Sequence, residues 1–402
     1  PFNNMKKIIY ILIVVIIITN LSCGKETTST NEANPFKAIN ATFGTNLDPT
    51  NLPDYANQFI PTYITKDNTN GNTITNSKAS LGRVLFYDTR LSINDSFSCA
   101  SCHIQNFAFG DTAADASDGV FGGLTGRHSM RLINARFAQE NKVFWDERAT
   151  SIENQSTQPF KDHNEQGFSG QNGRPNFDSL LRKIANIDYY KELFLFIYND
   201  NNVTETRLQE CLAQFVRSIQ SFDSKFDSGL SSANNLMSNF SNFTAQENMG
   251  KNLFLTPPTF DANSSRIGGG LGCNACHRAP EFDIDPNSLN NGIVGIIGKP
   301  GLDLTNTRAP SLRDLVNSSG TPNTPMMHTG ILKTLMQTIG HYGTINIAAG
   351  NTNLDNRLKP NGIGQKLNLN NIEVNAVMAF IKTLTGKNVY TDKKYSNPFL
   401  QK

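Results

Sequence analysis

The sequence predicts a mainly α-helical fold in which two similar domains follow each other along the chain. Apolar residues recur with the helical period in several stretches, whereas the alternating pattern of strands is weak throughout the 402 residues. The stretch Leu81–Phe86 is echoed by Met249–Phe254, and each is followed, after a variable loop, by Cys-x-x-Cys-His. A unit that occurs twice in this way indicates an internal repeat.

Each Cys-x-x-Cys-His motif has the spacing at which c-type haem is attached. In the first copy, Cys99 and Cys102 are expected to bond the porphyrin's vinyl groups, and His103 to be the proximal iron ligand. A single copy could also be a zinc half-site or a redox pair, but a complete second copy argues against both. We therefore expect two covalently bound haem c groups and two cytochrome c-type haem domains in tandem. The second copy supplies Cys273, Cys276 and His277.

The N-terminal residues have the pattern of an export signal. Lys6 and Lys7 precede the apolar run Ile8–Ile18, which is short for a membrane span and typical of a secretory signal. Leu21-Ser22-Cys23 follows and resembles a bacterial lipobox, with a plain secretory peptide as the alternative. We expect residues 1–23 to be a lipoprotein signal peptide, and a periplasmic protein anchored to the membrane by lipid on Cys23.

The remaining chain divides by composition. Residues 24–78 are rich in Asn, Thr and Pro and show little apolar periodicity, which predicts a tether or N-terminal extension with some ordered segments. The first haem domain is expected over residues 79–235 and the second over 243–390, with a Ser/Asn-rich boundary at 228–242. A net charge of +2 gives no indication of nucleic-acid binding.

Local signals predict several helices. One is expected over Ser80–Leu91, and another opens at the capping box Thr244–Glu247. The last is expected over residues 371–385, with Gly386 as its C-cap glycine. Cys211 lies within an apolar stripe of helical period, so we expect a buried structural thiol and no disulfide.

Beyond the haem motifs, roughly residues 80–390 resemble the bacterial di-haem cytochrome c peroxidase family, which includes the MauG-like di-haem maturation enzymes. Glycine is usual in this family where Glu147 stands here. The stretches that carry the resemblance are Phe144–Ala149, Ile152–Gln155, Arg308–Arg313 and Pro325–Gly330.

The resemblance implies three catalytic roles. It places Trp145, the single tryptophan, between the two haems as an electron relay; a large core aromatic is the alternative. It makes Glu165 the distal acid-base carboxylate at the N-terminal haem, with Gln155 as its hydrogen-bonding neighbour. Such a group is needed because peroxide must lose a proton from one oxygen and regain one on the other.

The resemblance also bears on the remaining iron ligands. No histidine lies between Ile104 and Arg127, where many members carry a loop ligand, so the first haem is either open, which we favour, or capped by His128. His128 stands where the family usually has the asparagine that helps to bind an interdomain calcium ion, which leaves calcium doubtful. At the second haem, Tyr342 occupies the ligand position, as in the maturation enzymes. Three rival methionines are assigned to core packing: Met326, Met327 and Met336.

The expected function is therefore a di-haem peroxidase that reduces hydrogen peroxide to water with electrons from a small cytochrome c or similar redox protein. A MauG-like oxidase that modifies a protein side chain is one alternative, and a plain di-haem electron carrier is another. A homodimer is left open by the sequence.

Overall fold

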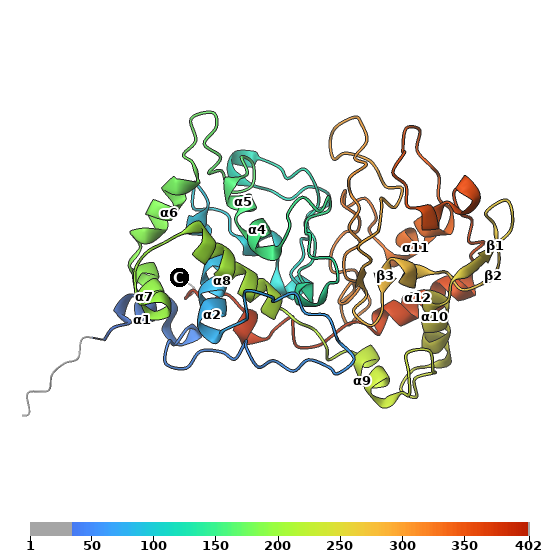
Figure 1. Ribbon diagram of the computed structural model, residues 1–402, viewed down its shortest axis with the longest axis horizontal. Helices are drawn as coiled ribbons and strands as arrows, with labels where there is room; N and C mark the ends of the chain where they lie inside the picture. Colours follow the sequence, from blue (N-terminus) through green and yellow to red (C-terminus); the bar gives the residue numbers. More distant parts are fainter. Residues whose placement is uncertain (1–33, 401–402) are drawn as a thin grey trace, which may run out of the picture. The chain divides into compact units, whose positions relative to one another are not determined.

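Helices dominate the computed structural model, which describes residues 34–400 (Figure 1). The predicted signal peptide and Cys23 lie outside these residues. The helices are α1 (Lys37–Phe43), α2 (Asn76–Tyr87), α3 (Cys99–Cys102), α4 (Ile152–Ser156), α5 (Gln158–Lys161), α6 (Phe177–Ala185), α7 (Asp188–Tyr198), α8 (Glu205–Ser218), α9 (Lys225–Ser232), α10 (Ala245–Leu255), α11 (Leu335–Gly343) and α12 (Asn371–Lys382). The mainly helical expectation is confirmed.

In the described part of the chain, sheet is confined to two short antiparallel pairs near the second haem motif. Strand β1 (Pro258–Phe260) pairs with β2 (Arg266–Gly269), and β3 (His277–Arg278) pairs with β4 (Asp283–Ile284). Within residues 34–400, no helix is both long and apolar enough to cross a membrane.

The internal repeat appears as two crossed helix pairs, α2 with α8 and α10 with α12. At the first crossing Gly82 approaches Cys211 so closely that a Cβ would overlap the Cys211 carbonyl oxygen. At the second crossing Gly250 stands in the same relation to the Ala376 carbonyl. The two glycines occupy matching places in the repeated stretches, and each lets the backbones of its helices meet.

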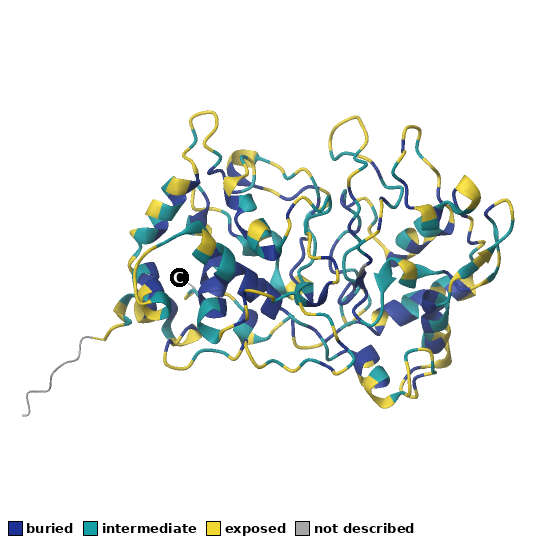
Figure 2. Ribbon diagram, viewed as in Figure 1, coloured by how far each residue is buried: buried dark blue, intermediate teal, exposed yellow. Residues whose placement is uncertain are grey.

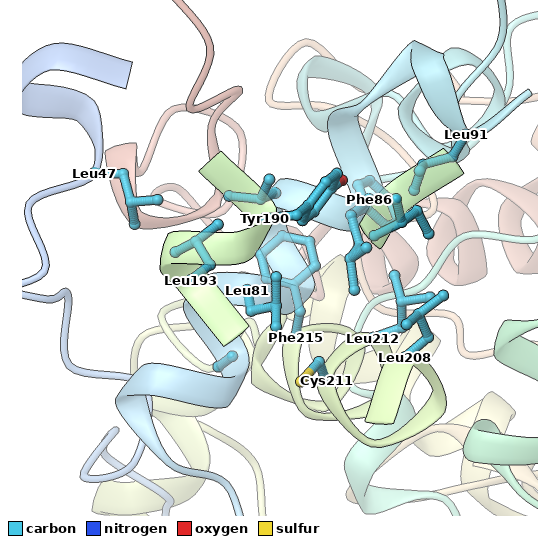
Figure 3. Packing of buried hydrophobic residues seen from close by; sticks show 14 of the residues in the cluster. Leu47, Leu81, Phe86, Leu91, Tyr190, Leu193, Leu208, Cys211, Leu212 and Phe215 are labelled. Atoms are coloured by element: carbon cyan, nitrogen blue, oxygen red, sulfur yellow. The ribbon is translucent and has the colours of Figure 1, made fainter. Parts of the chain in front are cut away.

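Buried residues, dark blue in Figure 2, form a first core at one crossing and a second core, made of two clusters, at the other. The first surrounds α2, α7 and α8, where Phe86 and Phe215 pack with ring centroids 5.2 Å apart (Figure 3). Cys211 lies in this core, as expected of a structural thiol, with its Sγ 3.2 Å from the Tyr198 hydroxyl. The second core includes a cluster of phenylalanines around Phe254 and Phe380.

The described part of the predicted N-terminal extension contains ordered segments. Residues 36–78 belong to the same compact unit as the rest of the described chain, and Phe43 and Tyr55 are fully buried in the first core. The predicted boundary at 228–242 is also packed, because Phe240 joins the second core beside Phe254. At both places a few aromatic residues within polar stretches bury enough apolar surface to order them.

Helix ends differ from the predicted ones by a few residues. Helix α2 begins at Asn76, with Thr75 as its N-cap, and ends at Tyr87. The capping box Thr244–Glu247 is confirmed. Gly386 is not a C-cap, since α12 ends at Lys382. Instead, the Gly386 N–H donates to the Asp314 carboxylate at 2.8 Å, where a Cβ would collide with Ser221.

Candidate active site

A cavity of about 850 Å³ adjoins the first haem motif. Cys99, Cys102 and His103 line it, and so do the predicted distal residues Glu165 and Gln155. The two cysteines begin and end the single turn of α3, which a Ser98–Ser101 capping box closes. The structure therefore brings the attachment thiols and the distal carboxylate to one space.

A second cavity, of about 460 Å³, adjoins the second motif. Cys273, Cys276 and His277 line it together with Tyr342 from α11. Most other lining side chains are apolar, and some of them come from β1, α11 and α12. Among the described residues that line this cavity there is no glutamate, in contrast to the first.

Both proximal histidines are oriented in the same way. Nδ1 of His103 lies 3.1 Å from the Phe109 carbonyl oxygen, and Nδ1 of His277 lies 3.1 Å from that of Pro310. Such a contact fixes the Nδ1–H tautomer and leaves Nε2 as the nitrogen for a metal. Burial lowers the pKa of both rings, that of His277 to about 4, so both are neutral, as ligation requires. The donor sets fit two c-type haems.

Trp145 lines both cavities. Its indole N–H donates to the His128 carbonyl at 2.7 Å, and its own carbonyl accepts the backbone N–H of Arg308 at 3.1 Å. The ring meets His328 edge-on, with centroids 6.2 Å apart. The sole tryptophan is thus held by the segments that separate the two predicted haem sites.

Glu165 has an unusual electrostatic environment. Burial raises the pKa of its carboxyl to about 7, and the nearby Asp162 adds to the rise, while Arg148 opposes it. The loop is fixed because the Glu165 N–H donates to Asp162 Oδ1 at 3.0 Å. A carboxyl that titrates near neutral pH can both take and give a proton there.

The backbone conformation at Glu147 explains why glycine is usual at this position in the family. Its φ is +55°, in the left-handed region that glycine adopts without strain. The neighbouring Arg148 stacks on Phe144 at 3.5 Å and donates to Asp146 at 2.8 Å, which holds its guanidinium at the first cavity.

His128 is buried, and both of its ring nitrogens face backbone carbonyls. Nδ1 lies 3.0 Å from Ser129 O, and Nε2 lies 3.1 Å from Ala113 O. Neither nitrogen is turned to an iron in this arrangement, which favours an open first site over one capped by His128. Among residues 34–400 no group of three His, Cys, Asp or Glu side chains is placed to hold a metal ion.

The three methionines assigned to core packing have different environments. Met326 is buried in the second core, as expected. Met336 is 59% exposed, so core packing does not explain it. Met327 lines the second cavity, and its Sδ accepts a hydrogen bond from Asn291 at 3.1 Å.

Sequence reasoning missed an ion-pair network beside Trp145. Arg127 pairs with Asp146 at 2.6 Å and with Asp303 at 2.7 Å, which joins residues before and after the repeat boundary. Asp303 is also 3.8 Å from His328. Arg127 and Asp146 flank motif residues, but no local signal identified Asp303 as their partner.

Comparisons with known proteins agree with this geometry. Residues 76–235 match the family model described as di-haem cytochrome c peroxidase. The chain is 27% identical over 331 residues to the methylamine utilization protein MauG of Methylophilus methylotrophus, which covers 78% of this chain and 84% of the relative. It is 26% identical over 323 residues to cytochrome c551 peroxidase of Nitrosomonas europaea, covering 77% and 80%.

Two solved structures share the fold. A MauG-like protein associated with microbial copper homeostasis superposes with a TM-score of 0.64 at 24% identity, covering 85% of this chain and 99% of that one. The diheme peroxidase BthA from Burkholderia thailandensis gives a TM-score of 0.57 at 19% identity, covering 85% and 89%.

Proposed function

The chain is a relative of the di-haem cytochrome c peroxidases and MauG proteins, and on this premise we propose that it reduces hydrogen peroxide to water. One observation carries the proposal. Glu165, Gln155 and Trp145 line the same cavity as the first haem motif, and Trp145 also lines the cavity of the second. An electron relay between two sites and an acid-base group at one of them are what peroxide reduction needs.

The haem c groups would be held by the two cysteines and the histidine of each motif, with Tyr342 as the distal ligand of the second. When bound, they supply the iron and the redox equivalents for O–O bond cleavage. The polypeptide supplies orientation, burial and proton transfer.

Glu165 is the proposed proton carrier. As a carboxylate it accepts the proton of the peroxide oxygen that is to bind, and as an acid it returns the proton to the departing oxygen. Its pKa of about 7 keeps both forms populated near neutral pH. Gln155 holds the substrate by hydrogen bonding, and Arg148 offers a positive charge to the oxygen that leaves.

Electrons would enter at the second haem from a small cytochrome c or similar redox protein and cross by way of Trp145. Two electrons and two protons convert each peroxide into two water molecules. A periplasmic location, with lipid on Cys23, follows from the sequence pattern and suits both the cofactor and such a donor.

A MauG-like oxidation of a protein side chain is the second candidate, favoured by Tyr342 and by the MauG relatives. A plain electron carrier would have no use for a half-buried carboxyl with a raised pKa in the first cavity.

Turnover assays separate these functions. The haem-loaded protein is mixed with peroxide and a reduced small cytochrome c, and oxidation of the cytochrome is followed by absorbance. Rapid oxidation supports the peroxidase. Consumption of peroxide without oxidation of the cytochrome indicates the protein oxidase, and no reaction with peroxide indicates the carrier.

A further inference from the structure

The second cavity presents two rival ligand atoms that share one hydrogen-bond donor. The side-chain nitrogen of Asn291 lies 3.1 Å from the Tyr342 hydroxyl oxygen and 3.1 Å from the Met327 sulfur. All three residues line the cavity that adjoins Cys273 and His277.

The orientation of the Asn291 amide follows from its other contacts. Its Oδ1 accepts the backbone N–H of Ile293 at 3.1 Å, so the NH₂ end faces the cavity. Its backbone carbonyl lies 2.9 Å from Nε2 of His341, the residue before Tyr342. Helix α11 therefore contacts Asn291 through two consecutive residues, which fixes the amide relative to the phenol.

Met327 is held at the cavity by a constrained backbone. Its φ is +72°, a left-handed conformation that is rare for a methionine. Its carbonyl accepts the N–H of Gly330 at 3.0 Å, which closes a turn around it. Strained backbone of this kind persists where the surrounding structure enforces it, and it often marks functional sites.

An amide N–H discriminates between the two atoms. A phenol oxygen is a much better hydrogen-bond acceptor than a thioether sulfur, so the shared donor holds the oxygen more firmly. The choice matters because an oxygen ligand favours ferric iron, whereas a thioether raises the reduction potential. We propose that Asn291 is a positioning residue that selects Tyr342 over Met327 as the distal ligand of the second haem. This proposal rests on the proposed function, because that function includes Tyr342 as a ligand of the second haem.

The test uses the haem-loaded full chain and the substitution Asn291→Asp, which keeps the acceptor for Ile293 and removes the donor. We expect the methionine–ferric charge-transfer band to appear, the ratio of methionine to tyrosine ligation to rise about three- to tenfold, and the potential of the second haem to increase. Adding Met327→Leu should abolish the new band. The matched control is Asn353→Asp, which removes an amide donor to the Leu304 carbonyl. Asn353 does not line the second cavity, so this substitution should leave the spectrum and potential of the second haem unchanged.

Two results would overturn the proposal. One is an Asn291→Asp protein with the ligand spectrum and potential of the wild type. The other is a wild-type protein without tyrosine ligation. Peroxide turnover, measured on the same samples, separates failure of the positioning role from failure of the proposed function. If the wild-type protein turns over peroxide but the Asn291→Asp spectrum is unaltered, only the positioning role is refuted. If the wild-type protein does not react with peroxide, the proposed function is refuted.

Discussion

The two halves of the described chain share a scaffold down to individual residues. Gly82 and Gly250 let α2 cross α8 and α10 cross α12. The next residue in each case is a buried cation that ties distant backbone together. Arg83 donates to the Lys394 carbonyl at 3.1 Å, and Lys251 donates to the Leu236 carbonyl at 2.7 Å.

The halves differ where the cofactors would react. The first cavity is larger and contains Glu165, with Arg148 at its edge, whereas the second is mostly apolar and contains Tyr342 and Met327. The attachment turn also differs, because it is helix α3 in the first half and a 3-10 turn leading into β3 in the second. Under the proposed function, a common scaffold would hold both cofactors, and a few cavity side chains would assign catalysis to one and ligation to the other.

Substitutions at the two helix crossings, which both halves share, should have the largest effect on stability. Gly82→Ala or Gly250→Ala places a methyl group against a carbonyl oxygen of the partner helix, which must move away. We expect each to lower the free energy of unfolding by about 3 kcal/mol or more, because overpacking here meets backbone and not a flexible side chain. Chemical denaturation measures the loss, and the haem content of each half shows which crossing failed. Near-wild-type stability of either variant would refute the equivalence of the crossings.

Glu165 lines only the first cavity, and its substitution should have the next largest effect, a loss of peroxide turnover. Glu165→Gln should keep both haems and the fold but lower peroxide turnover by about 10²–10⁴-fold, the usual contribution of a positioned acid-base group. Stopped-flow mixing with peroxide and reduced cytochrome measures this. Turnover close to the wild-type value would remove Glu165 from the mechanism.

The control for Glu165 should be another carboxylate of the same cavity. Asp118 is exposed and lines it, so Asp118→Asn should cause a much smaller loss. Glu153 is unsuitable, although it precedes Gln155 by only two residues. It forms an ion pair with the buried Arg217 and accepts from Asn72 at 2.8 Å, so its substitution would disturb folding.

The rate of reaction with peroxide should depend on pH through Glu165, which lines the first cavity. Burial raises the pKa of Glu165 to about 7, so below that pH the carboxyl is protonated and cannot take the proton of peroxide. The rate of reaction with peroxide should therefore fall about tenfold per pH unit below about 7 and level off above it. Glu165→Gln should abolish this dependence. A wild-type rate that is flat between pH 5 and 8 would contradict the assignment.

The sequence predicted the repeat and the haem motifs because both depend on local spacing. It also predicted that Glu165, Trp145 and Tyr342 would lie at the haem sites, by family resemblance, and the structure brings them to the two cavities. It could not predict Asn291, which meets Tyr342 across 51 residues of chain, because no periodicity records such a contact. The sequence predicted some ordered segments in residues 24–78 but could not locate them, because the Tyr55 hydroxyl donates to the Lys394 carbonyl, which is distant in the sequence.

The smallest expected effect is that of a glycine outside the helix crossings. It tests whether glycine is needed at the crossings because two helix backbones approach each other closely there. Gly340 lies within α11, as Gly82 lies within α2, but a Cβ there would meet no atom within 4 Å outside its chain neighbours and the backbone of its own helix. Gly340→Ala should therefore raise the free energy of unfolding by about 0.5–1 kcal/mol, because alanine loses less backbone freedom in a helix. A higher denaturation midpoint at an unchanged slope would show it. If Gly340→Ala destabilised the protein as much as Gly82→Ala does, helix crossing would not be the reason for glycine at the repeated positions.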